Sequence, residues 1–361
     1  MKSLVLPDRQ VLREVAETLA IALAGGSAFQ LLGLPAGLIS GSVLAVAGAA
    51  LAGRPMIVPL KLTRVILVVA GIALGSGVTP ETLRGITTYP LSIAILAVGT
   101  LSIFAGTAAY LRVVHRWDPL SALYGASPGA LAQVIGLAVE SRADLRAIVI
   151  VQTVRVLALS IGIPFSLAAF GFAGGAARVH PLTIGAFSLQ MLILVVVSIL
   201  SAVILARLKF PGGWLFGAMV GSGALHGAGF VEGRLPLWIG IVAMVGLGAI
   251  NGSRFAHTDR RMLLRFSGAA LGSFAVGLAL AALFIALAMS LMDLRPADLA
   301  IAYAPGAQDT MMVLALALNL DPIFVSSHHL ARFLICSIAV PFLARQIQRR
   351  EDRESIRTRD R

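Results

Sequence analysis

The sequence has few charged side chains for its length. Only 13% of its 361 residues are Asp, Glu, Lys or Arg, whereas about 25% is usual in a soluble domain. So few charges cannot cover a water-exposed surface, which excludes an ordinary soluble fold. Direct binding to nucleic acid is excluded as well. The net charge of +12 comes from basic residues between apolar segments and near the C-terminus, and no basic soluble module is present.

Residues suited to metal and redox chemistry are scarce. Cys336 is the only cysteine, so an intramolecular disulfide is ruled out. Four of the six histidines lie far apart in the sequence without ligand spacing, and the adjacent pair His328 and His329 would point to different helix faces. No phosphate-binding loop, dinucleotide fingerprint, Ser-His-Asp set or paired-carboxylate motif occurs in a credible context. We therefore expect no metal, no cofactor and no enzymatic activity.

The sequence is rich in hydrophobic residues and in long apolar runs. Its residues are 58% hydrophobic and its mean hydropathy is +0.91. Runs such as 182–205 and 266–292 are long enough for a bilayer core, which takes about 20 apolar residues per helix. The sequence therefore predicts an all-α polytopic membrane protein whose main partner is the lipid bilayer.

The chain also repeats itself. Residues 127–165 align without a gap with residues 304–342, and Gly71–Ser76 aligns with Gly248–Ser253 at the same offset of 177 residues. We predict two duplicated membrane repeats followed by a basic tail. Their bounds are 1–178, 179–345 and 346–361.

Each predicted repeat contains six hydrophobic segments. They run over residues 15–32, 36–53, 65–78, 91–111, 120–139 and 147–172 in the first repeat, and 182–205, 214–228, 236–251, 266–292, 299–318 and 323–344 in the second. If the fifth segment of each repeat is re-entrant, each repeat crosses five times and the second is inverted. The only loop Lys or Arg residues outside the cytoplasm are then Arg84, Arg178, Arg234 and Arg295. The positive-inside rule favours this topology over six crossings per repeat.

The expected location is the bacterial inner membrane, with several crossings and with both termini in the cytoplasm. We expect the first segment to be a retained helix rather than a signal peptide, because many further spans follow and no clear cleavage site stands out. The basic tail is expected to lie on anionic lipid, and docking of a partner protein is the alternative.

One Pro-Gly pair interrupts the fifth segment of each repeat, Pro128-Gly129 in the first and Pro305-Gly306 in the second. Proline removes a backbone donor and glycine adds backbone freedom, so each pair should break its helix. Broken backbone at membrane depth is tolerated only where it is buried in protein or lines a cavity. The two breaks therefore predict half-helix ends that face a solute.

Arg155 and Arg332 are the strongest candidates for binding that solute. Each lies inside an apolar helix, where a charge costs about 2.5–3.5 kcal/mol on insertion scales. In an inverted repeat the two would converge near the bilayer midplane and could grip a carboxylate or phosphate bidentately. The alternative is structural: each arginine pairs with a nearby acid or with carbonyls released by a broken helix.

Asp309 has no counterpart in the first repeat, where Ala132 stands at the equivalent position. It could neutralise a buried arginine such as Arg332, hold a proton or a coupling cation, or cap the helix that follows the break. His329 lies three residues before Arg332, on one helix face. The candidate substrate and coupling residues are Arg155, Arg332, Asp309, Gln308, His329, Gln152 and Gln133.

Other polar and small residues have structural interpretations. Asp144 and Asp321 are predicted to be helix N-caps. The Gly-rich stretches 37–53 and 213–229 are predicted to be close-packing faces rather than ligand loops. Glu17 and the 251–254 stretch (Asn-Gly-Ser-Arg) are weaker candidates.

Three stretches, Pro35–Gly41, Ala126–Leu131 and Tyr303–Asp309, resemble the bacterial AbrB-type membrane protein family. The resemblance covers roughly residues 15–345 and implies a duplicated membrane domain. Members are labelled regulators of gene expression or ammonia monooxygenases. Neither label finds support in the residues, because one needs a soluble DNA-binding module and the other a convergent metal-binding set. Broken-helix inverted repeats are also similar to cation/proton antiporters and bile-acid symporters, an analogy of architecture that does not fix function.

The sequence favours a secondary transporter for a small anionic solute, with H⁺ or Na⁺ as candidate coupling ions. A membrane protein that regulates gene expression through a partner is the runner-up, and a membrane monooxygenase is third and disfavoured. The sequence leaves the solute, the transport direction and the oligomeric state open.

Overall fold

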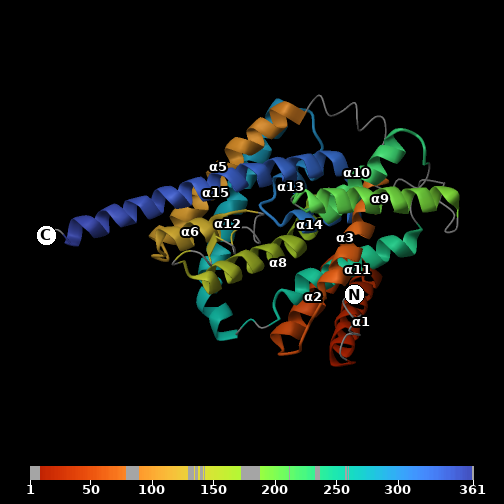
Figure 1. Cartoon of the computed structure of the whole chain (residues 1–361), viewed down its shortest axis with the longest axis horizontal. Coiled ribbons are helices and arrows are strands. Elements are labelled where there is room, and N and C mark those ends of the chain that lie inside the picture. The colour runs from red at the N-terminus through yellow and green to blue at the C-terminus, as the bar shows by residue number, and fades with distance from the viewer. Residues whose placement is uncertain are drawn as a thin grey trace. The chain divides into compact units, whose positions relative to one another are not determined.

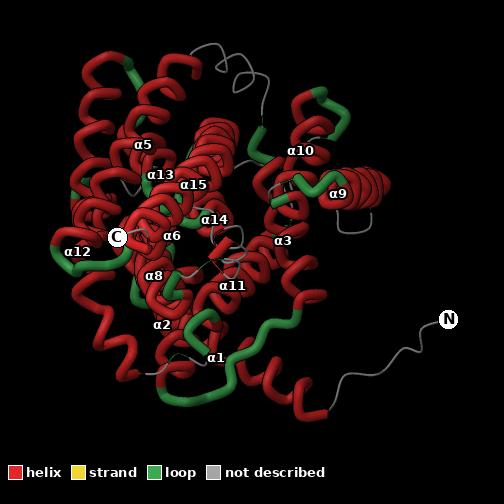
Figure 2. Tube along the Cα trace, turned by 60° about the vertical axis from the view of Figure 1, so that its left-hand side comes forward, coloured by secondary structure: helices red, strands yellow, loops and turns green. Residues whose placement is uncertain are grey.

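The computed structural model is helical wherever it describes the chain, with connecting loops and without strands in those parts (Figure 2). It describes residues 9–78, 89–128, 134, 137–138, 141, 143–171, 188–210, 212–231, 236–256, 258 and 260–359, without the side chains of 237, 260 and 351–359. The helices are α1 (Arg9–Leu31), α2 (Gly37–Leu51), α3 (Leu60–Gly75), α5 (Tyr89–Val113), α6 (Pro119–Ala126), α8 (Leu145–Ala169), α9 (Leu189–Arg207), α10 (Gly213–Gly227), α11 (Leu237–Ser253), α12 (Arg260–Leu291), α13 (Pro296–Tyr303), α14 (Gln308–Ala317) and α15 (Pro322–Arg359), as labelled in Figure 1.

These helices overlap the predicted hydrophobic segments, and the eleventh segment contains two of them, α13 and α14. Most of the fifth segment after Pro128 lies outside the described residues, and α15 continues beyond the twelfth segment to Arg359. Within the residues that the structure describes, five helices are long and apolar enough to cross a membrane: α5, α8, α9, and most of α12 and α15. The predicted all-α polytopic membrane-like fold is confirmed. The number of crossings, the re-entrant segments and the side on which the termini lie stay predictions.

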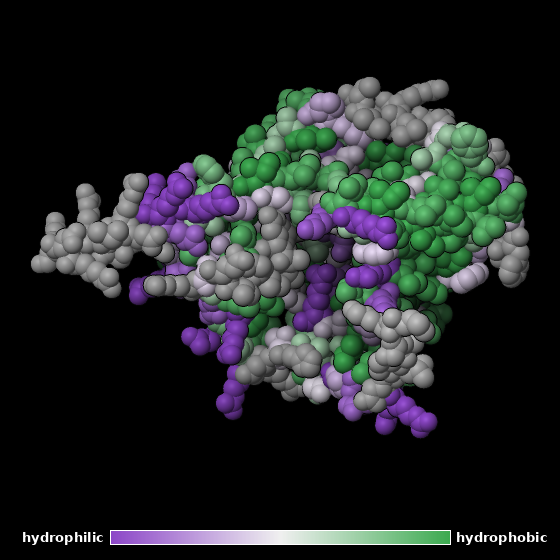
Figure 3. Space-filling view, viewed as in Figure 1, coloured by the Kyte–Doolittle hydropathy of each residue, from purple (hydrophilic) through white to green (hydrophobic). Residues whose placement is uncertain are grey.

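Apolar side chains face outward on the outer helices. On α9, Leu189, Leu192 and Leu200 are more than half exposed, and Figure 3 shows a continuous hydrophobic surface over α9 and α10. An exposed apolar surface of this extent is typical of contact with lipid rather than with water. The exposed leucines of α9 therefore suit the acyl chains of a bilayer.

The chain forms two compact units, and each draws on both predicted repeats. Unit 1 contains residues 1–86, 157–260 and 309–325, and unit 2 contains residues 87–156, 261–308 and 326–361. The predicted boundary near residue 178 is therefore not a boundary between compact units. The repeats remain a prediction about sequence and topology.

In unit 1 the helices contact one another in the order α1, α2, α11, α3, α10, α9. Helices about 177 residues apart in the sequence form the pairs α1 and α9, α2 and α10, and α3 and α11. If the two members of each pair are exchanged, the same order is obtained in reverse. The α1–α2 contact corresponds to α9–α10, and the α2–α11 contact corresponds to α10–α3. The helix contacts of unit 1 thus follow the offset of the sequence repeat.

Glycines allow these helices to approach closely. A Cβ on Gly75 of α3 would lie 2.5 Å from the Met219 carbonyl oxygen of α10, and a Cβ on Gly252 of α11 would lie 2.7 Å from Val46 Cβ of α2. At the starts of α2 and α10, a Cβ on Gly37 or Gly213 would press against the backbone of the preceding helix. The prediction that the two Gly-rich stretches are close-packing faces is confirmed at Gly37 and Gly213, whereas a Cβ on Gly48 would meet nothing within 4 Å.

Unit 2 contains α5, α6, α12, α13, the first half of α8 and most of α15. Its core joins four of these helices through Phe104 of α5, Tyr124 of α6, Ile148 of α8, and Cys336 and Val340 of α15. This packing brings α6 and α8 of the first predicted repeat against α15 of the second. Both predicted helix breaks begin in this unit.

Candidate functional site

The second Pro-Gly pair breaks its helix as predicted. α13 ends at Tyr303 and α14 begins at Gln308, so residues 304–307, which include Pro305 and Gly306, are not helical. A proline cannot continue the hydrogen-bond ladder, and the last carbonyls of α13 are left without partners inside their own helix.

The first break begins in the same way. α6 ends at Ala126, and Ser127 has an extended backbone just before Pro128. Gly129 and Gln133 lie outside the described residues, and the role of Gln133 stays a prediction. α6 therefore ends one residue before Ser127-Pro128, as α13 ends one residue before Ala304-Pro305.

Arg332 binds the end of α13. Its Nη2 donates to the Ala302 carbonyl oxygen at 2.5 Å, and its Nη1 donates to the Ala304 carbonyl oxygen. The side chain is only 2% exposed. A guanidinium at a helix C-terminus satisfies orphan carbonyls and is attracted by the negative end of the helix dipole.

Arg155 binds the end of α6 in the same manner. Its Nη2 donates to the Ser127 carbonyl oxygen at 2.7 Å and its Nη1 to the Ala126 carbonyl oxygen at 3.3 Å. The structural alternative for the two arginines, binding to carbonyls released by a broken helix, therefore describes their contacts. It does not exhaust their hydrogen-bonding capacity, because Nε of Arg155 is buried without a partner among the described residues.

Gln152 and His329 occupy equivalent places beside these arginines. Gln152 donates from Nε2 to the Tyr124 carbonyl oxygen at 2.8 Å and accepts from Arg155 through Oε1 at 3.3 Å. His329 makes the same pair of contacts, through Nε2 with the Ile301 carbonyl oxygen at 3.0 Å and through Nδ1 with Arg332 at 3.5 Å. Each break is therefore held by an arginine and by the residue three positions before that arginine. We call Gln152 and His329 the helper residues.

The two arginines act on each other electrostatically, and both act on the sulfur of Cys336. Within the described part of the chain, neither forms an ion pair with a carboxylate; the ion pairs found there are Arg54–Glu17 and Arg295–Asp298. The structure thus brings Arg155, Arg332, Gln152 and His329 together in unit 2. It leaves the two positive charges without a neighbouring acidic side chain in the described residues.

Further polar atoms at the breaks also lack partners. Ser127 Oγ and Gln308 Nε2 are buried and find no hydrogen-bond partner among the described residues. Buried polar atoms are normally satisfied by protein, water or ligand. Together with Arg155 Nε, these atoms make the surroundings of the two breaks polar, although the unit as a whole is apolar.

A second polar cluster beside α13 was not predicted from the sequence. Ser92 Oγ lies 2.5 Å from His328 Nε2, and the Tyr303 hydroxyl donates to the Ser92 carbonyl oxygen at 2.7 Å. Ser92 and Tyr303 are separated by 211 residues in the sequence. Only the fold brings α5 to the end of α13, so no local signal in the sequence could have identified Ser92.

Asp309 belongs to unit 1, and the positive charge that acts on it there is that of Arg254. The partner predicted from the sequence was Arg332, and Arg254 was only a weaker candidate. Asn251, on α11 one turn before Arg254, is 3% exposed, and its amide has no partner among the described residues. Asp309 is thus a neighbour of the end of α11.

The predicted N-caps are confirmed. Asp144 accepts from the backbone N–H groups of Arg146 and Ala147, each at 3.1 Å. Asp321 accepts from those of Ile323 and Phe324 at 2.9 and 3.1 Å. These caps fix the starts of α8 and α15, the two helices that carry the arginines.

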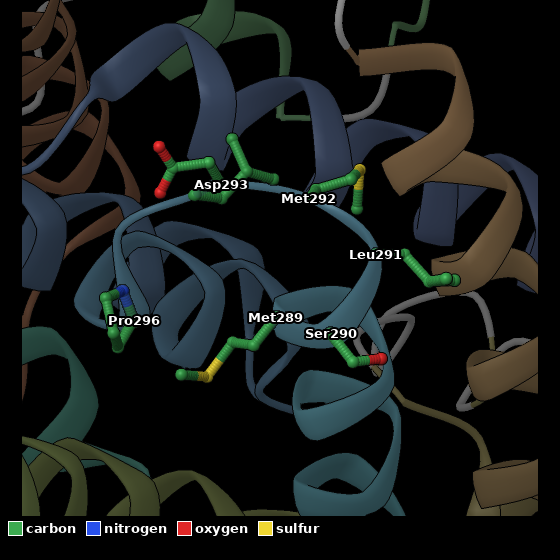
Figure 4. Close-up of a pocket in the computed structure, with 7 residues that line it drawn as sticks. Met289, Ser290, Leu291, Met292, Asp293 and Pro296 are labelled. Carbon is green, nitrogen blue, oxygen red and sulfur yellow. The ribbon is translucent and has the colours of Figure 1, made fainter.

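One surface hollow lies where α12 turns into α13, with a volume of about 550 Å³ (Figure 4). Its lining includes Asp293, whose carboxylate would repel an anion, and no arginine. It is therefore not the anion site. Among the described residues, no three His, Cys, Asp or Glu side chains group together as metal ligands.

Comparison with known proteins gives one family. The sequence profile of the family described as "AbrB: Transition state regulatory protein AbrB" matches residues 38–348. A similar protein of Bacillus subtilis (strain 168), "Uncharacterized protein YhjN", is 27% identical over 360 residues, which cover 90% of this chain and 91% of that protein. "Putative regulator AbrB" of Escherichia coli (strain K12) is 24% identical over 320 residues, which cover 87% of this chain and 90% of that protein.

Proposed function

The chain belongs to the AbrB family, and from that premise we propose that it is a secondary transporter of a small anion bound by Arg155 and Arg332. The observation that carries this proposal is the pair of buried guanidiniums, which repel each other and have no carboxylate partner among the described residues. Two such charges in an apolar unit favour binding of an anion, since buried charges are otherwise strongly disfavoured.

The helix ends compensate only part of this charge. Each helix C-terminus carries about half a negative elementary charge, so the ends of α6 and α13 together offset about one of the two positive charges. About one unit of positive charge is left for a ligand. A planar guanidinium also has donors to spare for a carboxylate or a tetrahedral oxyanion.

Broken helices support transport rather than static binding. Residues 304–307 are non-helical between two helices in an apolar protein. Such backbone occurs at membrane depth where it is buried in protein or lines a cavity, and in transporters it forms the binding site. Buried polar atoms without described partners lie at the same place, among them Ser127 Oγ and Gln308 Nε2. The arginines therefore have two roles, holding the half-helix ends and presenting their remaining donors to the solute.

A thermal-shift screen tests this proposal. Detergent-purified protein is heated with sulfate, phosphate, acetate or succinate, and with an amine and a sugar as uncharged or cationic comparisons. A ligand at about one hundred times its Kd stabilises the folded state by about 2.7 kcal/mol. We expect an anion to raise the Tm of the wild type and of Arg54→Gln, whose arginine is an exposed partner of Glu17. The same anion should not raise the Tm of Arg155→Lys or Arg332→Lys. Absence of any anion-dependent shift in the wild type contradicts the proposal.

Regulation through a partner is the second candidate function, and the name of the Escherichia coli relative favours it. The tail would be its docking element, because α15 runs without interruption to Arg359. Deletion of residues 349–361 separates the two functions. Anion binding and transport should survive the deletion, whereas signalling through the tail should not.

A further inference from the structure

The two helix breaks are held by the same contacts but by different chemistry. Gln152 and His329 stand at equivalent positions, and each bonds one helix-end carbonyl and one arginine. An amide cannot take up a proton near neutral pH, whereas an imidazole can. Only the second break therefore has a helper residue that can change its charge.

The contacts of His329 determine which of its nitrogens carries a hydrogen. The Ile301 carbonyl oxygen can only accept, so Nε2, at 3.0 Å, is the donor. The Arg332 guanidinium can only donate, so Nδ1, at 3.5 Å, has a free lone pair that accepts. His329 is thus neutral in this structure, and Nδ1 is the one ring atom that can accept a proton.

From this geometry we propose that His329 takes up one proton when a doubly charged anion binds to Arg155 and Arg332, so that the two are carried together. The proton, donated by the buffer acid of the surrounding solution, which becomes its conjugate base, forms a bond with the Nδ1 lone pair. The hydrogen bond from Arg332 Nη1 to Nδ1 breaks, because two donors now face each other. One N–H of Arg332 Nη1 is thereby released toward the anion, while the other still donates to the Ala304 carbonyl oxygen. This inference rests on the proposed anion site and names its coupling ion.

The surroundings of His329 explain why it takes up a proton only when the anion is bound. The charged or titratable side chains that act on His329 are Arg332 and His328 of α15. Arg332 in turn acts on Cys336 of α15, Tyr303 of α13 and Arg155 of α8, and His328 contacts the ring of Tyr89 of α5. None of these groups is a carboxylate. The positive charges among them oppose a further positive charge on the imidazole. An anion between the arginines removes that opposition, and by linkage the proton strengthens anion binding to the same degree.

Charge balance selects the type of anion. The two arginines and the two helix ends leave about one positive charge, because each helix end contributes about half a negative charge. A singly charged anion already neutralises this remainder. A doubly charged anion leaves an excess of about one negative charge, which a proton on His329 would neutralise. We therefore expect co-transport of a proton with a dianion such as a tetrahedral oxyanion or a dicarboxylate.

Calorimetric titration of the purified full-length protein with sulfate and acetate tests the inference. Both probes stay ionised between pH 6 and 8, so neither supplies or binds protons itself. Titrations in buffers of different ionisation enthalpy count the protons taken up. We expect about one proton per bound sulfate, about none per bound acetate, and sulfate affinity that falls with rising pH by up to about tenfold per pH unit.

His329→Gln gives the second break the helper residue of the first, so its fold is expected to persist, as thermal unfolding would report. In this variant proton uptake and the pH dependence of sulfate affinity should disappear. His226→Gln, which changes a buried histidine of α10 bonded to the Ser222 carbonyl, should keep both.

The outcomes are separable. If sulfate binds the wild type without proton uptake, or if uptake persists in His329→Gln, this inference is overturned while the anion site stands. If neither sulfate nor acetate binds the wild type, the inference and the proposed function fail together.

Discussion

Nη2 of Arg155 donates to the carbonyl oxygen of Ser127 at 2.7 Å, one residue beyond the end of α6. The equivalent arginine, Arg332, donates to the Ala304 carbonyl at the end of α13. A residue inside one helix thus fixes the point at which another helix stops. Loss of either guanidinium should therefore affect the stability of the protein as well as the binding of a solute.

Arg332→Gln should lower the free energy of unfolding by about 2–4 kcal/mol, since hydrogen bonds from a charged donor contribute about 1.5–3 kcal/mol each and glutamine replaces them only in part. Arg332→Lys keeps the charge and should lose less. Unfolding followed by tryptophan fluorescence in detergent measures both. A Gln variant as stable as the wild type would show that the carbonyl contacts contribute little.

Gly75→Ala should destabilise unit 1 by about 1–3 kcal/mol, the usual range for overpacking. A Cβ at Gly75 would lie 2.5 Å from the Met219 carbonyl oxygen, and backbone cannot move aside easily. Gly48 of α2 is the matched control, because nothing lies within 4 Å of a Cβ there. Gly48→Ala should leave stability unchanged or raise it by up to about 1 kcal/mol through helix propensity. Equal Tm values for the two variants would refute close packing at Gly75.

Asp321→Ala should cost about 0.5–2 kcal/mol, as is usual for removal of an N-cap, because two backbone N–H groups of α15 lose their acceptor. Asp144→Ala should have a similar effect at the start of α8. Asn retains an acceptor oxygen, so Asp321→Asn should be close to the wild type. An Asn variant as unstable as the Ala variant would point to a role for the negative charge instead of the cap.

Much of the fold could be predicted from the sequence. Hydrophobic length located the helices, Pro305-Gly306 located the break between α13 and α14, and Asp144 and Asp321 marked helix starts. Each of these features depends on residues close together in the chain. The local physics of helix breaking and capping is therefore enough to identify them.

The rest depends on packing between distant segments. The sequence offered an acid or a solute as partners for Arg155 but could not choose between these and the carbonyl of Ser127. It gave no reason to pair Asp309 with Arg254, or Ser92 with His328, since such pairs form only when helices far apart in the sequence assemble into one unit. Identical offsets indicate which residues are equivalent, and not which residues touch.

Uptake of radiolabelled sulfate into proteoliposomes tests the central claim most directly. With an inward proton gradient, wild-type protein and the chain lacking residues 349–361 should accumulate sulfate above empty liposomes, and Arg155→Lys and Arg332→Lys should not. If folded wild-type protein takes up no more sulfate, phosphate or succinate than empty liposomes, the claim that the paired arginines serve anion transport is contradicted.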